Sequence, residues 1–147
     1  MIADFTLPNC DKLPITISEQ LGDKRLLLLE FGAGWCVACR DNQPHLKELV
    51  ERFGDCIEVL TILSEEGVGM PPTSQFCAKW RDGCAERGCG VLPFQILTDP
   101  LKQTTKRHRD GSAIPVTVLT DRCGKVLFKA VGESPDLDDL VEAACSN

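Results

Sequence analysis

The most reactive side chains in this sequence are its nine cysteines, at positions 10, 36, 39, 56, 77, 84, 89, 123 and 145. Only Cys36 and Cys39 have two residues between them, in the stretch Trp35-Cys36-Val37-Ala38-Cys39. At this spacing one thiolate can attack a disulfide in another molecule, and its neighbour can then resolve the mixed disulfide. The odd number of cysteines also leaves at least one thiol outside any intramolecular disulfide.

The position of the pair says more than its spacing, because nine cysteines placed at random in 147 residues give roughly half of one CxxC by chance. The apolar run 26–31 predicts a buried strand, and apolar residues at helical spacing over 46–53 predict a helix from about 36 to 53. Cys36 should then lie at a helix N-terminus, where free amides and the helix dipole favour the thiolate. Cys39 follows one turn later and should be better shielded.

The remaining pattern predicts an α/β fold with a central mixed sheet flanked by helices. Strands are expected at 5–7 and 15–17 as an N-terminal β-hairpin, then at 57–63, 94–97, 116–120 and 125–131. Helices are expected at 74–86, in a short segment from Asp99-Pro100, and from Ser134-Pro135 onward, the last burying Leu137, Leu140, Val141 and Ala144. No linker or repeat divides the chain, so a single domain over 1–147 is expected.

Composition excludes several classes of protein. The chain has 16 Lys and Arg against 22 Asp and Glu, a net charge of -6, which disfavours binding to nucleic acid. Its longest apolar runs are far shorter than the roughly 18 residues that a membrane helix needs, so no transmembrane segment is expected. The first residues lack the basic and apolar regions of a signal peptide, so no signal or lipid anchor is expected in this chain.

With these elements in order, the sequence resembles the thioredoxin superfamily, and most closely its TlpA/ResA-type thiol-disulfide oxidoreductases. The matching stretches cover nearly the whole chain: 4–8, 14–18, 28–31, 35–40, Pro44, 96–100, 114–117 and 121–126. The resemblance implies a thioredoxin-like fold and an enzyme without a bound cofactor. It also implies protein disulfide clients, an upstream thiol-disulfide electron donor and a monomer.

The resemblance also assigns roles to individual residues. It makes Cys36 the nucleophile, Cys39 the resolving thiol, Glu30 a buried proton acceptor, Pro115 a cis proline facing the disulfide, and Trp35 and Ile114 client-binding residues. A desolvated carboxyl has a raised pKa and can take a proton from a thiol near neutral pH. From the residues alone, Glu30 could instead reach solvent at the end of its strand, and Pro115 could be trans at a sheet edge. Gly32 stands where the family often has an aromatic residue, which predicts a more open pocket beside the dithiol.

Other chemistries fit the pattern less well. A structural zinc site usually takes two close pairs of ligands, and this chain has one, so no metal is expected. His45 and His108 are both expected on the exposed surface, which argues against a cysteine hydrolase. A peroxidase would place its cysteine in a loop with activating Thr and Arg. The alternative to the oxidoreductase is a redox-silent module that binds a metal or a protein partner.

The segment from about 65 to 91 reads as a cysteine-rich insert. If 74–86 is a helix, the Cα atoms of Cys77 and Cys84 lie roughly 10 Å apart, too far for a disulfide. Cys89 can therefore turn back to either cysteine, and the shorter loop favours Cys84. A disulfide between Cys84 and Cys89 is expected to be structural, with a second redox pair as the functional alternative.

Two further expectations concern compartment and direction. Seven cysteines outside the CxxC are tolerated best where they can be oxidised, which favours a periplasmic or otherwise extracytoplasmic location, with the cytoplasm as the alternative. Val37 and Ala38 neither carry charge nor donate a side-chain hydrogen bond, so the Cys36 thiolate should be only modestly stabilised. The pair should then be a reductant, with a potential nearer roughly -270 mV than roughly -120 mV.

Overall fold

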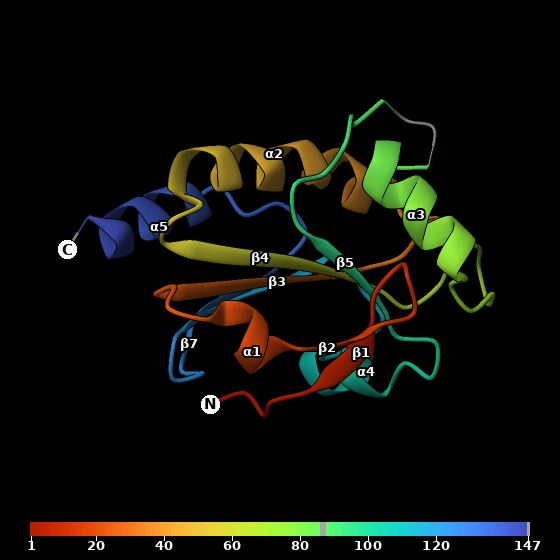
Figure 1. Cartoon of the computed structure of the whole chain (residues 1–147), viewed down its shortest axis with the longest axis horizontal. Coiled ribbons are helices and arrows are strands. Elements are labelled where there is room, and N and C mark those ends of the chain that lie inside the picture. The colour runs from red at the N-terminus through yellow and green to blue at the C-terminus, as the bar shows by residue number, and fades with distance from the viewer. Residues whose placement is uncertain (86–87, 147) are drawn as a thin grey trace.

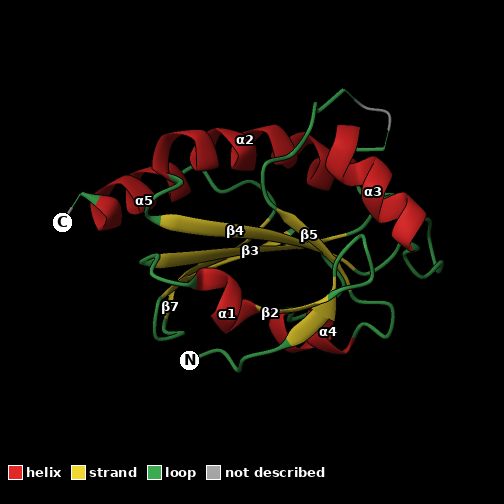
Figure 2. Ribbon diagram, in the orientation of Figure 1, coloured by secondary structure: helices red, strands yellow, loops and turns green. Residues whose placement is uncertain are grey.

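A computed structural model of the protein describes residues 1–85 and 88–146. Its centre is a five-stranded mixed sheet in the order β5-β4-β3-β6-β7, with helices on both faces (Figures 1 and 2). The strands are β1 Thr6–Pro8, β2 Pro14–Thr16, β3 Leu26–Gly32, β4 Ile57–Leu63, β5 Gln95–Thr98, β6 Val116–Asp121 and β7 Val126–Val131. The helices are α1 Ile17–Leu21, α2 Val37–Phe53, α3 Ser74–Gly83, α4 Gln103–His108 and α5 Leu137–Cys145. The predicted mixed α/β class is confirmed.

Strand β3 lies at the centre of the sheet. It pairs in parallel with β4 and antiparallel with β6, and all seven of its residues are buried. Alternate residues of a strand face opposite sides. Leu26 and Leu28 therefore pack under α2, α3 and α5, while Leu27 and Leu29 pack with α1 and the hairpin. Figure 1 shows α2, α3 and α5 on one face of the sheet and α1 and α4 on the other.

Four disulfides connect these elements, and all nine cysteines lie among the described residues. The pairs are Cys10–Cys77, Cys36–Cys39, Cys56–Cys145 and Cys84–Cys89, which leaves Cys123 as an exposed free thiol. Cys10–Cys77 ties the N-terminal hairpin to α3, and Cys56–Cys145 ties the end of α5 to the turn before β4. The 67-residue and 89-residue separations of these two pairs mean that they hold distant parts of the chain together.

Several sequence-based boundaries are wrong for local reasons. The helix expected from Asp99-Pro100 starts at Gln103, because the Asp99 carboxylate accepts hydrogen bonds from Thr105 N and Oγ1, both at 2.7 Å, across an intervening turn. Helix α1, directly after β2, was not predicted. Helix α3 ends at Gly83, and residue 86 of the range predicted for it lies outside the described residues.

The predicted positions of three side chains also need correction. Leu140 of α5 is 39% exposed, whereas its neighbours Leu137 and Val141 are buried as expected. His108 is buried and stacks on Phe31, with ring centroids 4.7 Å apart. The side chain of His108 therefore belongs to the core, and its burial lowers its pKa. The basic residues beside it in the sequence had indicated an exposed position. His45 is half-buried, because it lies where α2 meets α5.

Candidate active site

The Cys36–Cys39 disulfide lies at the beginning of α2. Cys36 is the N-cap residue, and its Sγ accepts a hydrogen bond from the Cys39 N–H at 3.1 Å. Cys36 keeps 6% of its surface exposed, and Cys39 keeps none. A Cβ on Gly32 would lie 2.9 Å from Cys39 Sγ, so the glycine lets α2 settle onto the end of β3. The space that the sequence suggested as an open pocket is thus occupied by Cys39 itself.

Glu30 lies on the same face of β3 as Gly32, two residues earlier, and therefore beneath the first turns of α2. Its side chain is fully buried, which excludes the solvent-facing alternative. Desolvation raises the pKa of Glu30 to about 8, although hydrogen bonds from Asn42 and Gln43 act in the opposite direction. Cys39 Sγ lies against Gly32. Strand residues two apart are separated by roughly 6.6 Å, so Glu30 is the next residue on this face after the one that contacts Cys39.

Gln43 holds the Glu30 carboxylate in place. Its Nε2 donates to Glu30 Oε1 at 2.8 Å and to the Cys39 carbonyl at 3.3 Å. Its Oε1 accepts from Thr61 Oγ1 at 3.0 Å and from Trp80 Nε1 at 3.2 Å. Thr61 and Trp80 both donate hydrogen bonds, so the amide oxygen of Gln43 must face them. The NH₂ group of Gln43 must then face Glu30.

Ile114 and Pro115, immediately before β6, lie beside the disulfide. The Ile114–Pro115 peptide bond is cis, and the Ile114 carbonyl oxygen lies 4.0 Å from Cys36 Sγ. A groove of about 160 Å³ runs beside this contact, lined by Ala38, Asp41, Asn42, Pro115, Gly132 and Glu133. The groove is a small open space on the side of α2 where Ala38 faces Pro115.

The beginning of the insert packs against the turn that carries Trp35. The Trp35 indole is 42% exposed and donates from Nε1 to Glu65 Oε1 at 2.9 Å. Glu65 Oε2 in turn accepts from Lys102 Nζ and from the Gly69 N–H, both at 2.7 Å. These contacts lower the pKa of Glu65, with the Lys102 hydrogen bond as the largest cause. Residues that are distant in sequence thus hold the indole in one position beside Cys36.

Residues 1–129 match the model of the AhpC/TSA family. The chain belongs to this family. It is 25% identical over 134 residues to an uncharacterized protein of Haemophilus influenzae, a match that covers 78% of this chain and 84% of that relative.

Solved structures show the same fold as this AhpC/TSA protein. The exposed lipoprotein thioredoxin Etrx1 of Streptococcus pneumoniae superposes with a TM-score of 0.75 at 23% identity, covering 99% of this chain and 100% of that one. The peroxidoxin BcpB of Mycobacterium tuberculosis superposes with a TM-score of 0.73 at 18% identity, covering 99% and 89%. The predicted thioredoxin-like fold is confirmed, and the chain has the family and fold of thiol-dependent oxidoreductases.

The insert of this AhpC/TSA protein contains the Cys84–Cys89 disulfide, the pairing that the short loop favours. Cys77, which the sequence left as a second choice, pairs with Cys10 instead. Cys84 is buried, and Cys89 Sγ lies 3.8 Å from the Arg40 carbonyl oxygen, so the disulfide packs the end of α3 against the first turns of α2. Figure 1 shows α3 beside the start of α2.

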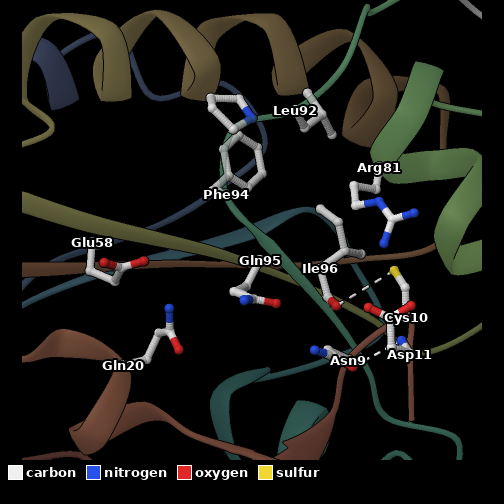
Figure 3. Close-up of a pocket in the computed structure, with 11 residues that line it drawn as sticks. Asn9, Cys10, Asp11, Gln20, Glu58, Arg81, Leu92, Phe94, Gln95 and Ile96 are labelled. Carbon is white, nitrogen blue, oxygen red and sulfur yellow. Dashed lines mark hydrogen bonds between the residues drawn. The ribbon is translucent and has the colours of Figure 1, made fainter. Parts of the chain in front are cut away.

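A hollow of about 320 Å³ lies between the hairpin, α3 and the edge strand β5, away from Cys36 and Cys39 (Figure 3). Arg81 from α3, Glu58 from β4 and Gln95 from β5 surround it. Arg81 is already paired with Asp82, and Glu58 with Lys24. The hollow marks where Cys10–Cys77 ties the hairpin to α3, and its Arg81 and Glu58 side chains already have partners within the chain.

Sequence reasoning missed Asn42 and Gln43, the two side chains that contact the Glu30 carboxylate. On a helical wheel they lie three and four residues after Cys39, on the face that lies over β3. That spacing was the signal that could have found them, because a polar residue on the buried face of a helix requires a partner.

Proposed function

We propose that the protein is a thiol-disulfide oxidoreductase that exchanges disulfides with protein clients through Cys36 and Cys39. The observation that carries this proposal is the disulfide at the N-terminus of α2, set between the Ile114-Pro115 edge and the buried Glu30. The helix N-terminus stabilises a thiolate at Cys36, and the full burial of Cys39 suits a thiol that reacts only within the molecule.

The reaction proceeds in two exchanges. The Cys36 thiolate attacks one sulfur of a client disulfide, and the other client sulfur leaves as a thiolate. Cys39 then gives its proton to the Glu30 carboxylate and attacks Cys36 Sγ, which releases the second client sulfur. The client leaves as a dithiol and the protein as the Cys36–Cys39 disulfide, which an upstream thiol donor must reduce. Trp35 and Ile114 flank the reacting sulfur and are the proposed client contacts.

The proposed direction is reduction of the client. Val37 and Ala38 contribute no charge to the site, and the Glu30 carboxyl lies beneath it, so the helix N-terminus is the main stabilising influence on the thiolate. Equilibration with glutathione buffers measures the potential. A value near roughly -270 mV supports a reductant, and a value above roughly -150 mV reverses the assigned direction.

Substitution of each cysteine tests the activity in an insulin-reduction assay with a dithiol donor. Cys36→Ser should be inactive, because no thiolate remains to attack. Cys39→Ser should accumulate a mixed disulfide with the client, because the second step is blocked. Cys123→Ser is the matched control and should keep the full rate. Wild-type turnover in either active-site variant would overturn the assignment of Cys36 and Cys39. Stoichiometric zinc in protein purified without chelator would support the redox-silent alternative.

The proposed location is extracytoplasmic. Disulfides persist in oxidising compartments, and this chain has three besides Cys36–Cys39. One structural neighbour is named as an exposed lipoprotein. No helix in the described part of the chain has the length and apolar character needed to cross a membrane.

A further inference from the structure

A chain of side-chain contacts runs from the buried Glu30 to the surface helix α5. Asn42 Nδ2 donates to Glu30 Oε2, and Asn42 Oδ1 lies 3.3 Å from His45 Nδ1. His45 Nε2 lies 2.5 Å from Asp138 Oδ1 on α5. None of these three outer residues touches the disulfide, and the exchange reaction proposed above does not use them.

The partners of Asn42 decide which way its amide points. The amide nitrogen of Asn42 donates to Glu30 Oε2, and it must face the carboxylate whenever Glu30 is ionised, because an ionised carboxylate offers only acceptors. The amide oxygen therefore faces His45, which has to donate from Nδ1. Asp138 Oδ1 lies beside the other ring nitrogen, so the His45 ring bridges Asn42 and Asp138. The amide of Asn42 is thus locked from its outer side.

We propose that Asn42 is a positioning residue for Glu30, held in its orientation by the His45–Asp138 pair, and that this chain sets the pH at which Cys39 resolves the mixed disulfide. The proposal rests on the proposed function, because it concerns the second exchange step. A donated hydrogen bond stabilises the ionised carboxylate, which is the form that accepts the Cys39 proton. Loss of the bond should leave Glu30 protonated to higher pH.

The surroundings of Glu30 allow the hydrogen bond from Asn42 to influence the ionisation of the Glu30 carboxyl. The residues that face the carboxyl from neighbouring elements are Gln43 on α2, Thr61 on β4 and Thr117 on β6, all uncharged. Charged groups lie further out along the chain of contacts and beside the groove: Asp41, His45 and Arg52 on α2, Glu133 before α5, and Asp138 on α5. Because no charged group faces the Glu30 carboxylate directly, the hydrogen bond from Asn42 provides a large part of the stabilisation of its ionised form.

The test follows the resolving step with 5,5′-dithiobis(2-nitrobenzoate), in a Cys123→Ser background so that no other free thiol reacts. Cys36 attacks the reagent and releases one thionitrobenzoate, and attack by Cys39 on the Cys36 mixed disulfide releases the second. The rate of the second release against pH reports the resolving step. In this pH–rate profile, Asn42→Leu should move the rising limb to higher pH by about one unit, so that the resolving step is about tenfold slower at pH 7. His45→Leu should move it in the same direction by a smaller amount.

Two further variants keep the proposal falsifiable. Asn42→Asp is nearly isosteric and places a carboxylate beside Glu30, so it should shift the limb at least as far as Asn42→Leu even if the latter folds poorly. Asp139→Asn removes the same charge from α5 as a change at Asp138 would, but has no contact with His45, and its profile should match the parent protein. An unchanged profile in both Asn42 variants, or an equal shift in Asp139→Asn, would overturn the proposal.

A measurement on the oxidised protein separates this inference from the proposed function. Carbon-13 NMR of the Glu30 carboxyl follows its titration without any exchange reaction. In Asn42→Leu the titration midpoint should rise by about one unit above that of the parent protein. If the parent protein never releases the second thionitrobenzoate, the proposed function fails. If it does, and the Glu30 titration is the same in the variant, only the role of Asn42 fails.

Discussion

Glu30 shows how two opposing physical effects meet at one residue. Complete burial favours the neutral acid, whereas two amide donors favour the carboxylate. Desolvation is the larger effect, and the pKa of Glu30 rises to about 8 in the oxidised protein. A carboxyl that titrates near the working pH can accept a proton in one step and return it in the next, which is what repeated disulfide exchange requires.

The raised pKa predicts a pH-dependent stability. In the unfolded chain Glu30 loses its proton near pH 4.5, whereas in the folded protein the Glu30 carboxyl stays protonated up to about pH 8. The folded state binds more protons between these values, so its stability falls as pH rises through this window and then levels off. Relative to Glu30→Gln, which cannot titrate, the wild-type protein should lose roughly 4 kcal/mol between pH 5 and pH 9.

Urea unfolding at pH 5, 7 and 9, with all disulfides intact, measures this difference. The exposed α2 residue Glu48 gives a matched control, because Glu48→Gln removes a carboxyl without removing a buried one. Its unfolding free energy should follow the wild-type pH dependence. Parallel curves for wild type and Glu30→Gln would contradict the assignment of the raised pKa to Glu30.

At this scale the sequence supports some residue assignments and hides others. The strand-turn-helix order places Cys36 at a helix start without any knowledge of tertiary contacts, because it depends only on local periodicity. Gln43 could not be identified in the same way, because its four partners come from β3, β4, α2 and α3. His108 was misplaced because its neighbours are basic, while the contact that buries it is with Phe31 on a distant strand.

At the scale of elements, the insert stabilises the turn before α2. Its first residues accept a hydrogen bond from the Trp35 indole and from the Gly34 N–H, the latter to the Glu65 carbonyl at 2.8 Å. A Cβ on Gly34 would overlap the Phe76 ring and lie 2.5 Å from the Glu66 carbonyl oxygen. The turn can therefore approach the insert this closely only because residue 34 has no side chain.

This close approach predicts the effect of Gly34→Ala. The Glu66 backbone cannot easily move aside, so the variant should lose about 1 to 3 kcal/mol of stability and slow client exchange by displacing Trp35. Gly83→Ala is the matched control, because its added Cβ meets nothing within 4 Å and it ends a helix. It should be neutral or slightly stabilising. Thermal unfolding of both variants tests this prediction. Equal melting temperatures for Gly34→Ala and Gly83→Ala would show that the turn tolerates a side chain at residue 34.

The elements themselves were predictable to different degrees. Strand β4 has the range 57–63 expected from its mostly apolar sequence, because a strand buried on both faces is largely hydrophobic. Helix α1 has five residues, too few for a helical period to be visible in the sequence. The pairing of Cys10 with Cys77 and of Cys56 with Cys145 follows from how the hairpin and α5 pack, and no spacing rule contains that information.

For the whole molecule, the disulfides divide into the pair proposed to be reactive and three others. Cys10–Cys77 fixes the hairpin, Cys56–Cys145 fixes α5, and Cys84–Cys89 closes the end of α3. Only Cys36 lies at the N-terminus of a long helix, where its thiolate is stabilised, and a stabilised thiolate leaves faster from a disulfide. The four disulfides should therefore open in a defined order.

Thiol titration of natively purified protein tests this order. Protein isolated without reductant should show one reactive thiol, Cys123, and one equivalent of a dithiol reductant should raise this number to three by opening Cys36–Cys39. The other three disulfides should open only with excess reductant or denaturant, because none of their cysteines is the N-cap residue of α2, where the leaving thiolate is stabilised. Alkylation and peptide mapping identify the opened pair, and Cys123→Ser should give zero and then two thiols. Nine thiols before any reductant is added would contradict the extracytoplasmic location, because they would indicate a protein kept reduced in the cytoplasm.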